Sequence, residues 1–169
     1  MRQKNAGFTL IEMMVALAIG SILTAMAVPN FRDMREGYRL RAATFDVFAA
    51  LQRARSEAVK KNNNYRFRVM TGTTYRVHDD LNSNGSINGV ETAPIRSIAA
   101  NAPGVLMSSD VEVWTGSGWS GAAASITFAP DGTTGGAADV ARRGTITLTN
   151  ANGDQRQIIV AASGRIRVE

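Results

Sequence analysis

The sequence of 169 residues contains no cysteine and a single histidine, His78. The absence of cysteine excludes a disulfide scaffold, a thiolate zinc site and a cysteine nucleophile. One histidine excludes a histidine-rich metal site, and we interpret His78, which precedes two aspartates, as a structural residue near a turn. The sequence therefore predicts no catalytic residues, no enzyme and no cofactor, in a chain of one domain's length.

Acidic residues are fewer than basic ones: 14 Asp and Glu stand against 19 Lys and Arg, which gives a net charge of +5. This excess makes nucleic acid or another anionic surface the first class of partner to test. The charge is unevenly placed, because residues 31–68 carry ten basic and four acidic side chains and residues 140–169 carry five arginines and two acids. A basic helical region and an arginine-rich end are the expected result.

Residues 8–28 form a long apolar run that contains one charged residue, Glu12. As a helix this run would be about 31 Å long, enough to cross the core of a bilayer. A secretory signal cleaved near residues 25–27 and a plain membrane anchor are two interpretations of such a run. Neither explains Glu12, because an ionisable side chain inside a spanning segment is costly and calls for a partner.

Residues 4–12, Lys-Asn-Ala-Gly-Phe-Thr-Leu-Ile-Glu, closely resemble the processing site of type IV pilins and type II secretion pseudopilins. The resemblance implies that a prepilin peptidase cleaves between Gly7 and Phe8 and that Phe8 becomes N-methylated. It also implies that Glu12 pairs with the amino terminus of a neighbouring subunit during assembly, which would neutralise a carboxylate in apolar surroundings. The implied partners are other major and minor pilins and, before assembly, the inner membrane.

A helical pattern continues beyond the apolar run. Pro29 is expected to kink the helix or to mark the limit of the membrane. Residues 62–64, three asparagines, are expected to end the helix. Between them, seven apolar residues recur at steps of three, four or six and predict a stripe that packs on a sheet: Phe31, Met34, Tyr38, Ala42, Phe45, Phe48 and Ala54.

From residue 65 onward, the period of the pattern changes to two. Strands are expected at 65–70, 73–78, 111–114, 125–129, 144–149 and 155–161. Asn152 and Gly153 predict a hairpin between the last two strands. We therefore predict an α+β fold in which one long helix covers an antiparallel sheet, the type IV pilin-like fold that the resemblance also implies. The expected divisions are a leader (1–7), a transmembrane helix (8–28), an amphipathic continuation (29–62) and a β-rich globular domain (63–169).

The globular part resembles the FimT/GspH group of minor pilins and pseudopilins in five segments, 54–58, 80–85, 126–132, 144–148 and 163–168. The order of these segments along the chain carries the resemblance. It implies a subunit that is incorporated into a pilus or pseudopilus, with the globular domain in the periplasm or outside the cell.

Residues 80–91 fit the spacing of an EF-hand calcium loop, with Asp80, Asn82, Asn84 and Glu91 as candidate ligands. The flanking sequence predicts strands rather than helices, which argues against a true EF-hand. The main interpretation is an Asx-rich turn that binds its own backbone, and a weak calcium site is the alternative.

The C-terminal sequence Gly164-Arg165-Ile166-Arg167 places two arginines on alternate positions. On an extended strand Arg165 and Arg167 point to one side, about 6.5–7 Å apart, which is close to the phosphate spacing of one nucleic-acid strand. Gly164 permits a sharp turn or a close backbone approach. The pattern resembles the G-R-x-R motif of FimT-type minor pilins, which are linked to DNA uptake in natural transformation.

The predicted function is thus a minor pilin that binds duplex DNA without sequence preference, through phosphate contacts. Arg165, Arg167 and Gly164 are the expected site, and Arg142, Arg143 and Arg156 are expected to support it. The alternative is a minor pseudopilin of a type II secretion system, or a subunit that primes pilus assembly, without DNA binding.

Overall fold

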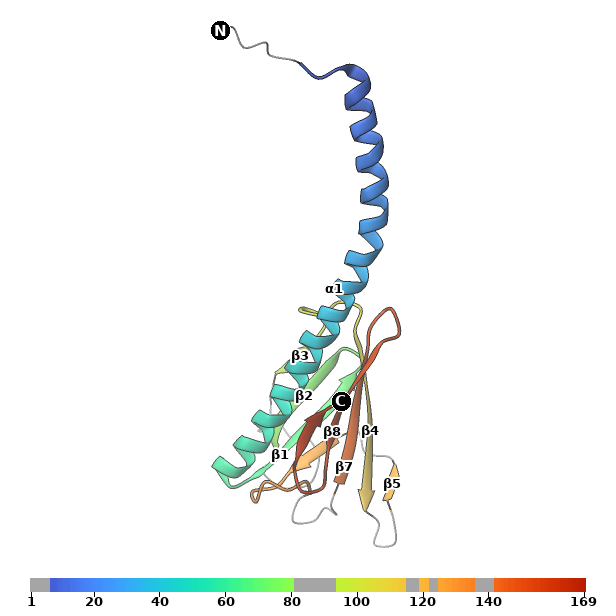
Figure 1. Cartoon of the computed structure of the whole chain (residues 1–169). Coiled ribbons are helices and arrows are strands. Elements are labelled where there is room, and N and C mark those ends of the chain that lie inside the picture. Colours follow the sequence, from blue (N-terminus) through green and yellow to red (C-terminus); the bar gives the residue numbers. More distant parts are fainter. Residues whose placement is uncertain (1–6, 81–93, 115–118, 122–124, 136–141) are drawn as a thin grey trace. The chain divides into compact units, whose positions relative to one another are not determined.

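The structure is a computed structural model that describes residues 7–80, 94–114, 119–121, 125–135 and 142–169. Within these residues it contains one helix and nine strands (Figure 1). The chain divides into two compact units, Met1–Arg35 and Glu36–Glu169, and each is described by itself.

Helix α1 (Leu10–Lys61) has sequence-encoded ends on both sides. At its start the Glu12 amide donates to Thr9 Oγ1 at 3.3 Å, half of the capping box that the Thr-x-x-Glu spacing encodes. At its end Asn62 takes a left-handed φ of 51°, and the amide of Asn63 donates to the carbonyl of Ala58 at 3.2 Å. This is a Schellman-type stop, and it confirms the helix end predicted from the asparagines.

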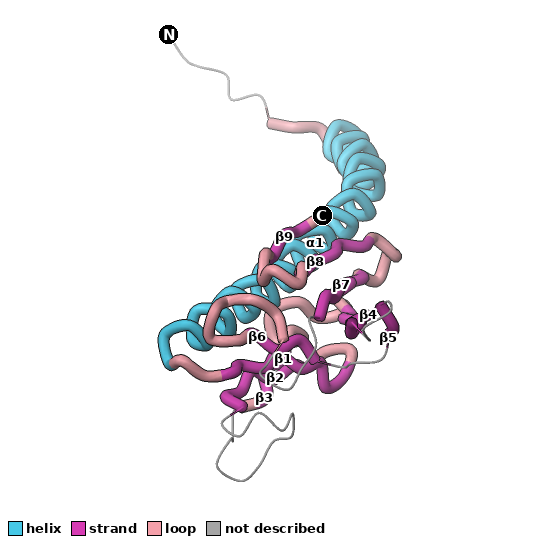
Figure 2. The backbone as a smooth tube through the Cα atoms, turned by 90° about the horizontal axis from the view of Figure 1, so that it is seen from below, coloured by secondary structure: helices cyan, strands magenta, loops and turns pink. Residues whose placement is uncertain are grey.

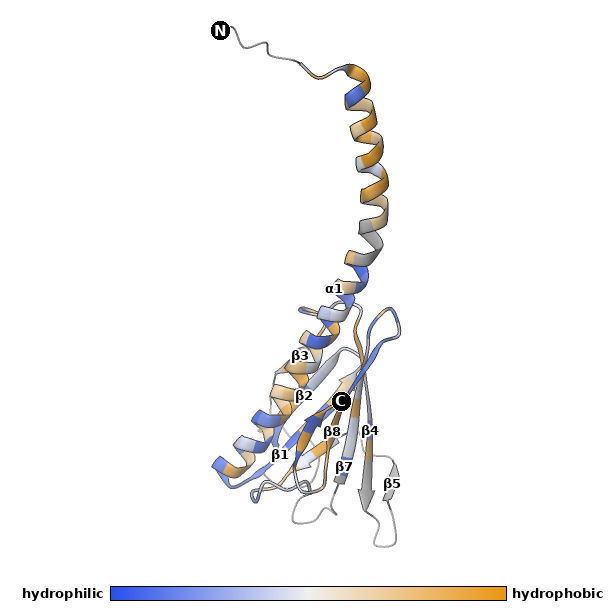
Figure 3. Cartoon of the chain, in the orientation of Figure 1, coloured by the Kyte–Doolittle hydropathy of each residue, from blue (hydrophilic) through white to orange (hydrophobic). Residues whose placement is uncertain are grey.

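Along residues 10–26 of the first unit, apolar side chains lie on all sides of the helix, and Glu12 is the one charged residue (Figure 3). The described side chains of residues 10–26 are exposed, including Leu17 at 70% and Ile22 at 60%. By length and composition this helix could cross a membrane. A helix that is apolar all round requires burial by lipid or by other chains.

In the second unit, nine strands form two antiparallel sheets (Figure 2). The first sheet has the order β3 (Ile95–Ser97), β2 (Thr74–Asp80), β1 (Asn64–Thr71) and β6 (Ser125–Phe128). The second has the order β5 (Trp119–Gly121), β4 (Leu106–Trp114), β7 (Arg142–Thr149), β8 (Gln155–Val160) and β9 (Ile166–Val168). The hairpin predicted from Asn152 and Gly153 is confirmed as β7–β8, and the strands predicted at 65–70 and 73–78 are confirmed and form the hairpin β1–β2. It predicted one sheet rather than two, and it missed β3 and β5, which are too short to show alternation.

The core of this unit joins the second part of α1 to both sheets. Residues from β1, β2 and β6 and from β4, β7, β8 and β9 belong to one buried cluster. The helix contributes a face of mostly small side chains to this cluster: Leu40, Ala43, Val47, Ala50, Leu51, Ala54 and Ala58.

The predicted packing stripe of α1 was therefore wrong, apart from Ala54 and the partly buried Phe48. Tyr38 and Phe45 are 61% and 65% exposed. The helix carries two apolar stripes at helical spacing, and sequence periodicity does not rank them. The small-residue stripe faces the sheets because alanines allow the helix backbone to approach them closely.

Candidate nucleic-acid interface

The two C-terminal arginines are both exposed, and Ile166 between them is buried. Arg167 lies opposite Ile159 of β8, which in turn lies opposite Thr145 of β7. These residues alternate with the buried Ile146, Ile158 and Val160, so they share the face of the second sheet that points away from the core.

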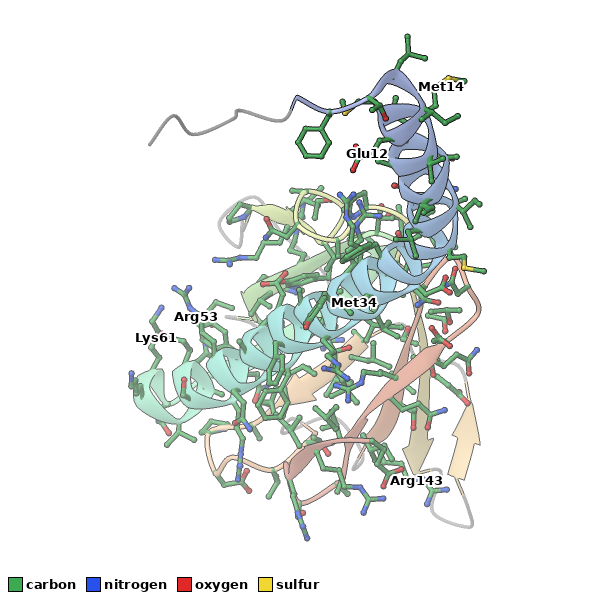
Figure 4. All side chains as sticks on the ribbon, turned by 45° about the horizontal axis from the view of Figure 1, so that its top comes forward. Glu12, Met14, Met34, Arg53, Lys61 and Arg143 are labelled. Atoms are coloured by element: carbon green, nitrogen blue, oxygen red, sulfur yellow. The ribbon has the colours of Figure 1, made fainter. Side chains whose placement is uncertain are left out.

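Arg143 belongs to this same face, because it lies two residues before Thr145 on β7 and is exposed. Figure 4 shows it near the start of that strand. The structure thus brings Arg143, Arg165 and Arg167 together on one outward face of the second sheet. We call these three residues the arginine face.

Two of the predicted supporting arginines are not part of the arginine face as described. Arg156 is opposite the buried Leu148 and lies two residues before the buried Ile158, so it is on the core side of β8 and is partly buried. Arg142 is the first residue of β7, and its side chain lies outside the described part of the chain.

Acidic residues adjoin the arginine face on two sides. On β4 the exposed Asp110 lies opposite Thr145 and Glu112 lies opposite Arg143, and on the other side Glu169 follows β9. Arg167 Nη2 lies 3.0 Å from Glu169 Oε1, with both side chains 54% exposed. The backbone of Glu169 is held by two hydrogen bonds with Gln157, of 3.0 Å and 2.8 Å. An exposed pair of this kind is weak, so Arg167 can exchange Glu169 for another anion at little cost.

Gly164 introduces this strand in a conformation that only glycine adopts readily, with a φ of 75°. It is buried, and a Cβ atom at this position would overlap the carbonyl oxygen of Gly132. The backbone therefore turns sharply at Gly164 and closely approaches the carbonyl of Gly132, as the sequence predicted for this glycine.

Gly132 belongs to a tight loop after β6. The Thr133 amide and hydroxyl donate to Asp131 Oδ1 at 2.9 Å and 2.7 Å. These bonds, the hydroxyl first and the amide next, lower the pKa of Asp131. The loop therefore carries a stable carboxylate at neutral pH.

The predicted processing and assembly residues lie in the first unit. Phe8 is 78% exposed, and Gly7 and Glu12 are exposed as well. Glu12 lies in the first turn of α1 (Figure 4). Residues 1–6 lie outside the described part.

The predicted calcium loop is only partly described. Asp80 is fully buried, and its Oδ2 accepts a hydrogen bond of 2.9 Å from Arg66 Nη2. This ion pair gives the Asp80 carboxylate a structural role at the end of β2. Asn82, Asn84 and Glu91 lie outside the described residues, so the calcium alternative stays a prediction.

Sequence reasoning missed Arg55 of α1, which contacts the loop of Gly132. Its Nε donates to the Gly132 carbonyl at 2.9 Å. Arg55, Gly132 and Gly164 belong to three of the five segments that carried the FimT/GspH resemblance. Its place in one of these segments was the signal that could have identified Arg55, although no local sequence pattern predicts that the three segments meet.

Two family models match the chain. The model described as "Prokaryotic N-terminal methylation motif" matches residues 2–28. The model described as "Type II transport protein GspH" matches residues 43–164. No curated protein matches this chain.

Solved structures show the same fold. The type IV minor pilin FimU of Pseudomonas aeruginosa (strain PAO1) has a TM-score of 0.55 at 20% identity, over 80% of this chain and 92% of that chain. The minor pseudopilin EpsH from the type 2 secretion system of Vibrio cholerae has a TM-score of 0.52 at 9% identity, over 78% of this chain and 96% of that chain.

The long N-terminal helix, the antiparallel sheets and the methylation motif define a type IV minor pilin or pseudopilin. Such a protein is a structural subunit that assembles with other pilins. The chain belongs to the family described as Type II transport protein GspH, whose model covers most of its length.

Proposed function

We propose that this subunit, once incorporated into a pilus, binds duplex DNA without sequence preference during DNA uptake. The observation that carries the proposal is the arginine face, where Arg165 and Arg167 are exposed on the same side of β9 and Arg143 shares their face. Cationic side chains spaced along one outward face suit the regular negative charge of a nucleic-acid backbone.

The neighbours of these arginines favour phosphate contacts over base contacts. The described residues of the same face on β7 and β8 are threonines, glutamines and one isoleucine: Thr145, Thr147, Thr149, Gln155, Gln157 and Ile159. None of them is an aromatic side chain on which a base could stack. Hydroxyl and amide groups donate readily to phosphate oxygens, which position a protein on DNA without reading its sequence.

The proposal includes a route to the filament. The prepilin peptidase cleaves between Gly7 and Phe8, Phe8 is N-methylated, and the apolar helix holds the subunit in the inner membrane. On assembly Glu12 pairs with the amino terminus of a neighbouring subunit, and the globular unit lies in the periplasm or outside the cell. Support for this route comes from the methylation motif at residues 2–28 and the exposure of the apolar helix.

Binding of the full chain in neutral detergent to a labelled duplex tests the DNA proposal. The wild type should bind with micromolar or weaker affinity that falls steeply with salt. The double variant Arg165→Gln/Arg167→Gln should bind more weakly, and its log–log salt slope should be smaller by up to about two units. The double variant Arg41→Gln/Arg68→Gln is the matched control, because it removes two exposed arginines away from the arginine face.

Equal losses in both double variants would mean that net charge alone drives binding. Wild-type affinity in Arg165→Gln/Arg167→Gln, or binding without salt dependence, would overturn the DNA proposal. The alternative would then stand: a minor pseudopilin or a priming subunit that does not bind DNA.

A further inference from the structure

Three segments that are distant in the sequence meet at the turn that leads through Arg165 into β9, the strand of Arg167. They are the Arg55 turn of α1, the loop after β6 and the turn before β9. Arg55 Nε donates to the carbonyl of Gly132 at 2.9 Å, across 77 residues of chain. The same carbonyl oxygen lies against the Cα of Gly164, where a Cβ would overlap it and would lie 3.1 Å from Arg55 Nε.

The turn before β9 is tied to its surroundings by further backbone bonds. The amide and hydroxyl of Thr134 donate to the carbonyl of Ala162 at 3.0 Å and 3.1 Å. Within the turn, the Gly164 amide donates to Ala161 at 2.8 Å, and the Ala161 amide donates to Arg165 at 2.9 Å. The backbone of Arg165 is thus fixed by a turn that rests on the loop of Gly132.

Arg55 supports this arrangement from the core side of β9. Gly164 and Ile166 are buried on that side, whereas Arg165 and Arg167 are exposed on the other. Arg55 is partly buried, and among the described residues no carboxylate forms an ion pair with it. Its bond to a backbone carbonyl is therefore the interaction that the structure assigns to this guanidinium.

We propose that Arg55 is a positioning residue for DNA binding: through Gly132 and Gly164 it fixes the turn that presents Arg165 and Arg167, without contacting DNA itself. The inference rests on the proposed DNA-binding function. It adds a residue of the long helix, more than a hundred positions away in sequence, to the determinants of affinity.

The variant Arg55→Met tests this in the full chain in neutral detergent, with the same labelled duplex. Its affinity should fall about threefold to tenfold, within the range of couplings between residues of one hydrogen-bond network. Arg53→Met is the matched control, because it removes the same charge two residues away on the same helix. Arg55→Lys, which keeps the charge and a donor, should restore part of the affinity.

A double-mutant cycle separates positioning from direct contact. In the Arg165→Gln/Arg167→Gln background, Arg55→Met should have no further effect on affinity or on the salt slope. A further decrease in slope of about 0.9 in that background would show that Arg55 contacts a phosphate, and this would overturn the positioning role. Hydrogen exchange of residues 161–168 should accelerate in Arg55→Met and stay unchanged in Arg53→Met.

The two proposals fail in different ways. If Arg165→Gln/Arg167→Gln weakens binding but Arg55→Met binds like Arg53→Met, the positioning role is wrong and the DNA proposal remains. If Arg165→Gln/Arg167→Gln binds like the wild type, the DNA proposal fails and the positioning role fails with it. Should Arg55→Met not fold, the same comparison is made with Arg55→Lys against Arg53→Lys.

Discussion

Two stretches of the same helix meet opposite environments. Along residues 10–26 most side chains are apolar and all are exposed, whereas along residues 40–58 one face of mostly small side chains is buried against two sheets. The second stretch finds its burial within its own chain. The first must find it outside, in lipid or in other subunits, because exposed apolar surface of that extent is unfavourable in water. Hydrophobicity alone therefore does not identify the face that builds the domain.

The strongest test of this comparison uses one substitution in both stretches. Leu51 is fully buried and Leu17 is 70% exposed. Leu51→Ala should lower the free energy of unfolding of the globular unit by about 2–5 kcal/mol, because it removes buried apolar atoms and leaves a cavity. Leu17→Ala should change it by less than about 0.5 kcal/mol. Urea unfolding followed by circular dichroism measures both, and equal effects would contradict the comparison.

Within the globular unit, two glycines separate the effect of backbone strain from the effect of close packing. Gly164 and Gly153 both have positive φ, of 75° and 87°, but an added Cβ would meet a carbonyl only at Gly164. Gly153→Ala should cost about 1 kcal/mol from backbone strain, and Gly164→Ala should cost about 2–3 kcal/mol because the turn must also move. Thermal unfolding of both variants checks the difference. Equal costs would mean that the contact with Gly132 does not constrain the turn.

A smaller effect on stability is expected where residues 40–58 of α1 contact β2. Tyr75 is buried and its hydroxyl donates to Asp46 Oδ2 of α1 at 3.3 Å. Burial, followed by the nearby Asp46 carboxylate, raises the pKa of Tyr75 to about 12 from 10.0. Because the pKa of Tyr75 is higher in the folded state than in the unfolded state, the protonated hydroxyl contributes to the free energy of unfolding. This contribution is complete below pH 10 and is lost as the pH rises to about 12.

Tyr75→Phe should therefore lose less stability than the wild type between pH 10 and 12, although at neutral pH it lacks the hydrogen bond to Asp46. Urea midpoints at several alkaline pH values measure the two slopes. Parallel slopes for the two proteins would show that the pKa of Tyr75 is not raised.

The smallest effect on unfolding is expected for Glu12→Ala, in the exposed residues 10–26 of α1. Glu12 is exposed in its own chain, so the globular unit should unfold at the same urea concentration as the wild type. If Glu12 pairs with a neighbouring amino terminus as proposed, incorporation into filaments should fall steeply, because an unpaired ammonium would be buried. Immunoblots of sheared filaments measure incorporation, and intact mass should still show N-methyl-Phe8. Normal incorporation would reject the pairing, and a mature chain starting at Val28 would reject pilin processing.

The sequence by itself determined the features that depend on neighbouring residues. The Thr9–Glu12 spacing set the start of α1 and the asparagines set its end. Alternation and the Asn152–Gly153 turn determined β7 and β8. Alternation also placed Arg165 and Arg167 on one side with Ile166 on the other. These are properties of local backbone geometry, so a short window of sequence contains them.

Only the tertiary structure decided which helical stripe is buried, how many sheets form and which arginines share a face. The alanine-rich stripe is buried and the aromatic stripe is exposed, because the distance between the helix and the sheets depends on the side chains that the sheets present. Strand register separated Arg156 from Arg143, and the contact of Arg55 with Gly132 and Gly164 joins three segments that have no local relation. Such choices depend on volumes and registers between distant segments, which no local pattern specifies.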